Sequence, residues 1–201
     1  MKYSICISGA AGGKTVEADK PLAQRVGREI ARLDHVTTTG ATVGLPYYGA
    51  KAAKDAGGMS IGFSPASSLR EHLHKYHLPI GVFDFINFTG MHYTGRDVYL
   101  IQSSDAVITI GGRFGSLHEF TTAVESGTLC GVLTGSGGTA DKIPELMATL
   151  EPPHKDLVIF DDNPEKLVQK IVKILDKEYS DIDTKDELAR WYLDTNAPHY
   201  G

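Results

Sequence analysis

Short apolar runs alternate with amphipathic stretches along most of the chain. The apolar runs are rich in β-branched residues and end at glycine, proline or polar residues, which is typical of buried strands. We therefore expect strands at Lys2–Ser8, Val36–Thr39, Met59–Phe63, Val82–Phe88, Asp105–Ile110, Gly131–Leu133 and Leu157–Phe160.

Most of the intervening segments place apolar residues three or four positions apart, which is the spacing of one helix face. We expect helices after Pro21, from Pro46 to Ala56, from Met91 to Ser103, after Ser116, from Ile143 to Leu150 and after Pro164. The pattern is loose between Ser64 and Pro79, where no element is predicted. The alternation predicts an α/β fold with a doubly wound, mostly parallel sheet and helices on both faces.

Nothing in the sequence divides the chain into parts. Residues 1–201 contain no repeat, low-complexity segment or linker, so we expect a single domain. The segment 180–201 is charged but carries Leu188, Trp191 and Tyr192 on one helical face. We expect this segment to dock on the domain or on a second subunit.

Glycine-rich loops follow several of the predicted strands. In a parallel sheet the carboxyl ends of the strands share one edge, and ligands bind beyond that edge. The stretch Asp105–Gly127 turns from a strand into a helix through such a loop, which offers backbone N–H groups and a helix N-terminus to an anion. The predicted phosphate-binding residues are Gly9, Gly40, Gly44, Gly111, Gly112, Arg113, Gly115 and Ser116.

Composition narrows the function classes. The formal net charge of -5 argues against a general nucleic-acid binder, although one cleft can still be basic. Two cysteines provide neither a disulfide framework nor zinc spacing. The N-terminus lacks the features of a signal peptide, and no run approaches the roughly 18 apolar residues of a membrane span. We expect a cytoplasmic protein without membrane contact.

Two local patterns have competing interpretations. The segment SGAAGGKT suggests a P-loop with Lys14 on phosphate and Thr15 on magnesium, but Gly9 stands one position too late and helix signals come only near Pro21. The spacing of Ser116 and Glu119 fits a capping box, in which Glu119 bonds back to the Ser116 amide. A carboxylate at that position also lies at the mouth of the predicted phosphate corner, so a catalytic role for Glu119 stays open.

Three nearby histidines do not suggest a metal site. Residues His72, His74 and His77 share no single helical face, so we expect them to be solvated side chains. No metal or organic cofactor is predicted.

Two motifs resemble those of a known family. The segments MHYTGR (Met91–Arg96) and GGRFGSLHE (Gly111–Glu119) resemble the M-H-x-R-K and P-G-G-x-G-T-x-x-E signatures of the LOG family, formerly described as lysine decarboxylases. If Arg96 takes the place of the motif arginine, the interval from Arg96 to Glu119 matches without a gap, although two residues separate Tyr93 from Arg96 where the family has none. The segment from Thr38 to Pro65 adds further matches, so the resemblance covers about residues 3 to 135.

The resemblance implies a Rossmann-like homodimer that hydrolyses the N-glycosidic bond of a nucleoside 5'-monophosphate. Glu119 would then stabilise an oxocarbenium-like ribose or orient water, and Arg96 would pair with Glu119 or with the ligand anion. Gly111 replaces the motif proline, Arg113 its second glycine and Ser116 its threonine. Because the same superfamily includes nucleotide sensors and molybdenum cofactor carriers, a non-catalytic protein that binds a nucleotide or pterin is the alternative.

Overall fold

The structure, a computed structural model, describes residues 1–180. The strands are β1 (Ser4–Gly9), β2 (Val36–Thr39), β3 (Met59–Ser64), β4 (Phe85–Phe88), β5 (Ala106–Ile110), β6 (Leu129–Leu133) and β7 (Val158–Asp161). The α-helices are α1 (Lys14–Arg32), α2 (Leu45–Asp55), α3 (Leu69–His74), α4 (His92–Gln102), α5 (Phe114–Ser126), α6 (Ile143–Leu150) and α7 (Pro164–Glu178). The predicted docking segment 180–201 lies almost wholly outside the described residues.

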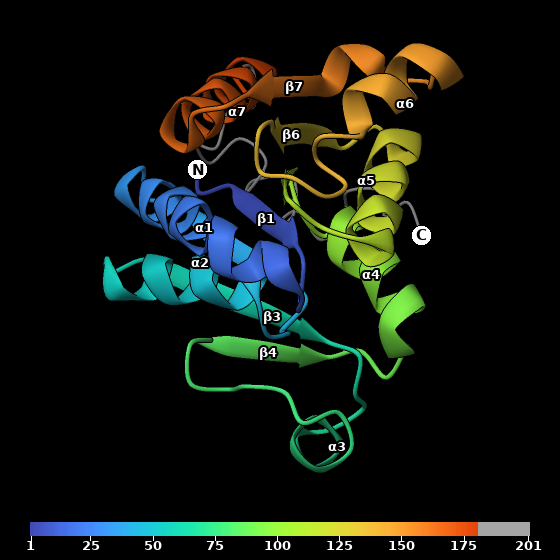
Figure 1. Ribbon diagram of the computed structural model, residues 1–201. Coiled ribbons are helices and arrows are strands. Elements are labelled where there is room, and N and C mark those ends of the chain that lie inside the picture. The colour runs from blue at the N-terminus through green and yellow to red at the C-terminus, as the bar shows by residue number, and fades with distance from the viewer. Residues whose placement is uncertain (181–201) are drawn as a thin grey trace, which may run out of the picture.

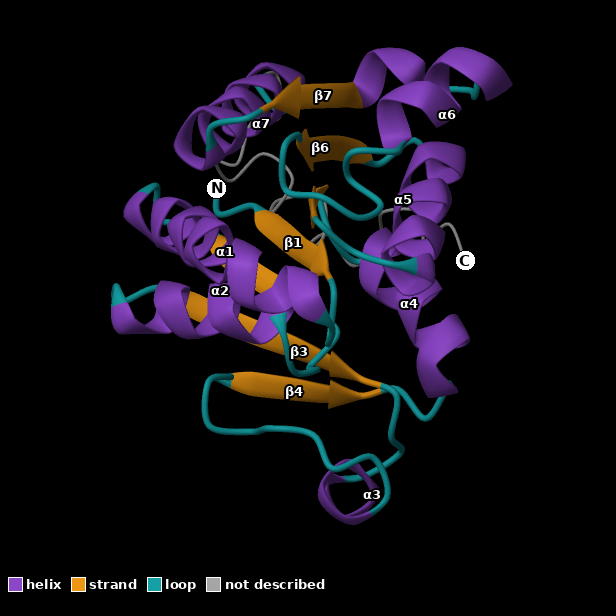
Figure 2. Ribbon diagram, viewed as in Figure 1, coloured by secondary structure: helices purple, strands orange, loops and turns teal. Residues whose placement is uncertain are grey.

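All seven strands pair in parallel in the order β4-β3-β2-β1-β5-β6-β7. Helices α1, α2 and α7 cover one face of the sheet, whereas α4, α5 and α6 cover the other (Figures 1 and 2). The predicted α/β class is therefore confirmed, and the sheet is wholly rather than mostly parallel.

The hydrophobic core lies in two layers, one on each face of the sheet. Side chains along β1 alternate between them, with Ile5 and Ile7 under α1 and Cys6 under α4 and α5. Because successive residues of a strand point to opposite faces, a strand buried on both sides carries mostly apolar or β-branched residues. This explains the continuous apolar runs that predict the central strands.

Helix α1 begins earlier than the sequence signals suggest. It starts at Lys14, after Gly13 at φ 103°, and Pro21 lies inside it. Proline usually marks a first turn because it lacks the N–H of a helix interior. Here Val16 and Asp19 are buried ahead of Pro21, and this packing favours the extra turns at the N-terminus. The prediction of a late helix start is therefore wrong, and it no longer provides an argument against a P-loop.

A short helix also occupies the segment in which no element is predicted. Helix α3 begins after Ser68, whose side chain accepts a hydrogen bond from the Glu71 amide. Its six residues are too few to show helical periodicity in the sequence. Among the described residues, no helix combines the length and apolar character that crossing a bilayer requires.

The topology creates a switch point between β1 and β5. From β1 the chain runs outward through β2, β3 and β4, and then returns to add β5 on the other side of β1. The loops after β1 and β5 therefore leave the sheet in opposite directions. Such a divergence opens a crevice at the carboxyl ends of the two strands.

Candidate functional site

A cavity of about 210 Å³ lies at the switch point. Its walls come from the ends of β1 and β2, from α4 and from the first turns of α5. The lining residues are Gly9, Ala10, Ala11, Gly40, Thr42, Pro46, Tyr93, Arg96, Asp97, Arg113, Gly115, Ser116 and Glu119. The structure thus brings together most of the predicted site residues, although their roles in binding stay predictions.

The remaining predicted residues, Gly44, Gly111 and Gly112, do not line the cavity. Gly44 has φ 79° and packs so closely on the β1–α1 loop that a Cβ would lie 2.6 Å from Ala11 Cα. The Gly111 amide donates to Ser136 Oγ at 2.8 Å. These glycines shape the loops around the cavity, and the Gly111 N–H already has a protein partner.

The capping-box interpretation of Ser116 and Glu119 is wrong. Helix α5 begins at Phe114, with Arg113 as its N-cap, and the Leu117 amide donates to the Arg113 carbonyl at 2.9 Å. The left-handed backbone of Gly112, at φ 99°, allows the chain to turn into the helix this early. Ser116 therefore lies inside the helix, and Glu119 projects toward the cavity rather than back to a helix end.

Arg96 is the buried cation of the cavity. It is only 4% exposed, and its guanidinium lies against Gly40, where any Cβ would overlap Nη1. Its Nη2 is 3.0 Å from Asp97 Oδ1, and its Nη1 is 3.9 Å from Glu119 Oε1. Neither Nε nor Nη1 has a hydrogen-bond partner among residues 1–180. The guanidinium thus lies against two carboxylates, but its Nε and Nη1 make no hydrogen bond within the described residues.

Glu119 is held beside Arg96 by a contact from the sheet. Ser8 Oγ at the end of β1 donates a hydrogen bond to Glu119 Oε2, because β1 and β5 are neighbours and α5 follows β5. Burial raises the pKa of Glu119 to about 7, Arg96 opposes this rise, and the Asp97 carboxylate adds to it. Close to neutral pH, this carboxyl can therefore both hold and release a proton.

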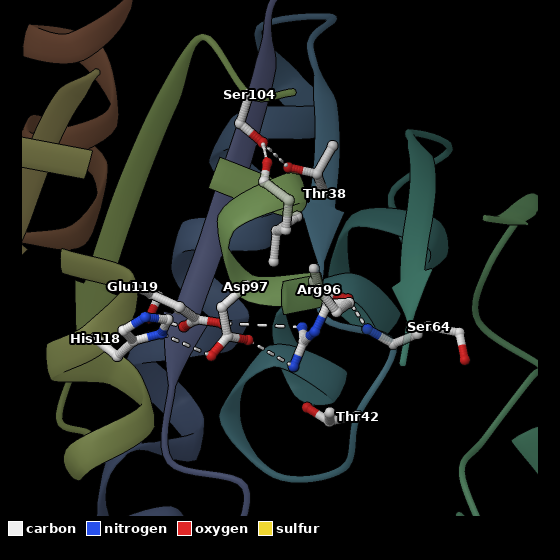
Figure 3. Close-up of polar contacts among 12 residues, drawn as sticks. Thr38, Thr42, Ser64, Arg96, Asp97, Ser104, His118 and Glu119 are labelled. Atoms are coloured by element: carbon white, nitrogen blue, oxygen red, sulfur yellow. Dashed lines mark hydrogen bonds and ion pairs between the residues drawn. The ribbon is translucent and has the colours of Figure 1, made fainter. Parts of the chain in front are cut away.

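The sequence interpretation missed Asp97, His118 and Ser8. Asp97 is buried beside Arg96, and its Oδ2 lies 3.1 Å from His118 Nδ1 (Figure 3). Neighbouring residues on a helix point in different directions, so no spacing rule connects these three side chains. Only the packing of α4 beside α5 and the position of β1 bring them together.

The expectation that the histidines are solvated is wrong for His72. Its side chain is fully buried, with Nδ1 2.8 Å from Ser64 Oγ and Nε2 3.0 Å from the Pro79 carbonyl. It fastens the α3 segment to the end of β3. Within residues 1–180, no three His, Cys, Asp or Glu side chains gather in a way that could hold a metal ion.

Comparison with known families agrees with this architecture. The model of the SLOG cluster4 family matches residues 2–168. The chain belongs to this family. Membership confirms the resemblance that Met91–Arg96 and Gly111–Glu119 suggest, at the level of the wider Rossmann-like superfamily that includes LOG proteins.

One relative and two solved structures are similar to this chain in sequence or in fold. An uncharacterized protein of Archaeoglobus fulgidus is 32% identical over 115 residues, which are 57% of this SLOG chain and 70% of the relative. The molybdenum cofactor binding protein from Rippkaea orientalis is 26% identical, with a TM-score of 0.72 over 87% of this chain and 98% of that one.

The second solved structure is DNA processing protein A from Helicobacter pylori, which binds single-stranded DNA. It is 19% identical, with a TM-score of 0.60 over 86% of this chain and 81% of that one. Because a protein with this fold binds a nucleic acid, the exclusion of nucleic acid from the net charge stays a prediction.

Proposed function

We propose that this protein binds a small phosphate-bearing ligand, a nucleotide or a phosphorylated pterin, in the cavity at the switch point. The observation that supports the proposal is the guanidinium of Arg96, which is buried in the cavity wall and whose Nε and Nη1 have no hydrogen-bond partner among residues 1–180. A buried charge is costly unless its hydrogen-bonding groups are satisfied. An anion beside Arg96 would reduce that cost.

The first turn of α5 provides a second group of donors for the phosphate. Its N-cap, Arg113, makes no side-chain hydrogen bond to the helix end, so the first N–H groups have no side-chain cap. A Cβ built on Gly115 would meet nothing within 4 Å, and the approach to this helix end is open. The helix dipole and the exposed Arg113 side chain both favour an anion there.

The size of the cavity indicates which part of the ligand it holds. Ligand pockets commonly measure about 300–1,000 Å³, whereas this cavity measures about 210 Å³. It therefore fits a phosphate with part of a sugar or a similar linker. The planar ring would lie toward the exposed part of the lining, to which Tyr93, 47% exposed, and Arg113 both contribute. The cofactor bound by the similar Rippkaea orientalis protein supports a pterin as one such ligand.

Calorimetric titration of the purified protein with a panel of nucleoside monophosphates and pterin phosphates tests this proposal. We expect saturable binding of at least one compound, weakened about tenfold by Arg113→Ala because one charge-assisted contact is lost. Arg70→Ala is the matched control, since Arg70 is exposed and lies outside the cavity. No binding across the panel would refute the proposal, and equal affinity of Arg113→Ala would remove Arg113 from it.

Hydrolysis of the N-glycosidic bond is the second candidate function. The observation that favours it is the position of Glu119, whose carboxyl has a pKa of about 7 and lies beside Arg96 and Ser8. In its ionised form this carboxylate would stabilise positive charge on the ribose, and in either form it could orient water. The resemblance to LOG hydrolases adds to this argument.

Release of free base from nucleoside 5'-monophosphates, followed by chromatography, tests for turnover. We expect Glu119→Gln to lower the rate at least about 100-fold while ligand binding remains, because glutamine keeps the shape but not the charge. Ser126→Ala on the exposed end of α5 is the control. If the wild-type protein releases no more base than Glu119→Gln, the hydrolase candidate is abandoned and the binding function stands.

Three broader expectations also belong to this proposal. We propose that the chain is one domain, acts in the cytoplasm and forms a homodimer. The family resemblance implies the dimer, and light scattering of the purified protein measures it directly.

A further inference from the structure

Asp97 joins an arginine and a histidine side chain from different helices. Its Oδ1 is 3.0 Å from Arg96 Nη2 on α4, and its Oδ2 is 3.1 Å from His118 Nδ1 on α5. Asp97 is 6% exposed, whereas the His118 side chain is 37% exposed. Figure 3 shows that Asp97, His118 and Glu119 converge on the same side of Arg96. One buried carboxylate thus links the cavity to an imidazole that reaches solvent.

The family resemblance does not explain Asp97. If Arg96 is aligned with the arginine of M-H-x-R-K, Asp97 occupies the position of lysine, so the charge at this position is reversed. Two carboxylates, Asp97 and Glu119, therefore flank Arg96 in a buried site. An anionic ligand at Arg96 would bring further negative charge close to both of them.

The other groups that face this cluster do not accept a proton that would offset the negative charge of the ligand. From β1, the buried Cys6 thiol and the Ser8 hydroxyl approach Glu119. Burial raises the pKa of Cys6 well above its ordinary value, and burial likewise raises the pKa of Tyr93 on α4, so both stay neutral. Arg113 at the mouth of the cavity is exposed and always charged. Glu119, whose pKa burial raises to about 7, is the group of this cluster that can accept a proton near neutral pH.

We propose that Asp97 and His118 are positioning residues that couple the binding of a phosphate group at Arg96 to the uptake of one proton. The inference rests on the proposed binding function. The proton comes from solvent and goes to the Glu119 carboxylate, and no covalent bond of the ligand changes. Proton uptake offsets the charge that the ligand adds to the buried site.

The direction of the pH dependence follows from Glu119. Burial raises its pKa to about 7, and the Asp97 charge contributes to that rise. Below pH 7 the carboxyl already carries a proton and does not repel the ligand. Above pH 7 it is ionised, so binding must add a proton and the affinity falls with rising pH. Maximal affinity is thus expected on the acidic side of neutrality.

Calorimetry with adenosine 5'-monophosphate and with inorganic sulfate tests the coupling, because sulfate mimics a phosphate group but does not titrate near neutral pH, so any proton taken up with it goes to the protein. Titrations at pH 7.5 in buffers of different ionisation enthalpy count the protons taken up, and we expect between about half and one per ligand for the wild-type protein. Asp97→Asn should lose most of this uptake and bind about tenfold more tightly, because one negative charge beside Arg96 is removed. Asp97→Glu, which keeps the charge, should keep the proton uptake.

His118→Gln tests the contribution of α5 to the cluster separately from that of α4. Without the imidazole, Asp97 is free to pair with Arg96 alone, so we expect proton uptake to decrease and the affinity to fall severalfold. Asp55→Asn is the control for loss of an exposed carboxylate and should change neither quantity, because Asp55 pairs with Lys51 far from the cavity. If Asp97→Asn does not fold, the His118→Gln result decides.

A measurement without ligand keeps this inference separate from the proposed function. Carbon-detected NMR titration of Glu119 should show a lower pKa in Asp97→Asn than in the wild-type protein, since the Asp97 charge no longer disfavours ionisation. If neither probe binds the wild-type protein, the proposed binding function is refuted for these two ligands, and the coupling of proton uptake to their binding is refuted with it. Binding without proton uptake, or an unchanged Glu119 pKa in Asp97→Asn, overturns the inference and leaves the binding function intact.

Discussion

Replacement of Gly40 by alanine should abolish ligand binding while the sheet stays folded. Gly40 follows β2 directly, and a Cβ built on it would overlap Arg96 Nη1 and lie 2.7 Å from Nη2. The backbone of Gly40 is not left-handed, so alanine itself fits the chain there. The three heavy atoms nearest to that Cβ all belong to the guanidinium, which is buried and cannot stay in place. We expect the affinity to fall at least about 100-fold, or about 3 kcal/mol.

Calorimetric titration with the best ligand of the panel measures this loss, with thermal unfolding as the check on folding. Arg96→Ala is the reference, because both variants remove the same guanidinium from the cavity and should bind equally weakly. Gly81→Ala is the matched control, since a Cβ there would meet nothing within 4 Å. Binding by Gly40→Ala at the wild-type affinity would show that Arg96 does not hold the ligand.

The sequence predicts the sheet well because the central strands are buried on both faces. Along β5, every residue from Ala106 to Ile110 is buried, and a run that is apolar apart from the β-branched Thr109 marks the strand. The limits of the helices are harder to predict. Local signals place the start of α1 near Pro21, but the burial of Val16 and Asp19 against the rest of the fold extends the helix to Lys14. Tertiary packing thus overrides the local signal.

The site was predictable only where one sequence segment carries its own geometry. Strand, glycine turn and helix follow one another from Ala106 to Ser126, so the corner at Gly112 and Arg113 could be located from spacing. The partners of Glu119 could not be predicted from spacing. Ser8 reaches it because β1 and β5 are neighbours in the sheet, and sequence order does not specify that adjacency. The capping-box error has the same origin, because a local rule fitted Ser116 but the helix begins earlier.

Helices α1 and α2 are in close contact, and this contact positions the loop that contains Gly40. Gly27 on α1 faces Gly49 on α2, and a Cβ at Gly27 would collide with the Gly49 carbonyl oxygen and lie 2.8 Å from its carbon. Gly49 in turn faces the side chain of Ile7 on β1, where a Cβ would lie 2.5 Å from Cδ1. The two helices and the sheet therefore meet at glycine, with no space for a methyl group.

Gly27→Ala should lower the free energy of unfolding by about 3 kcal/mol. In an exposed helix the same change stabilises by about 1 kcal/mol, but here the methyl group meets backbone atoms that no rotamer change can move. The helices must separate, which opens the core layer around Ile7 and Val26. Urea denaturation measures the loss, and Gly115→Ala is the matched helical control because its Cβ meets nothing within 4 Å.

The consequence for the site follows from the same geometry. Helix α2 begins immediately after Gly44, so a displaced α2 also moves the Gly40–Gly44 loop that supports Arg96. We therefore expect Gly27→Ala to weaken ligand binding as well, although Gly27 lies outside the cavity. A variant as stable as the wild-type protein would contradict the close approach of α1 and α2. A variant that is less stable but binds normally would show that the loop keeps its position independently of α2.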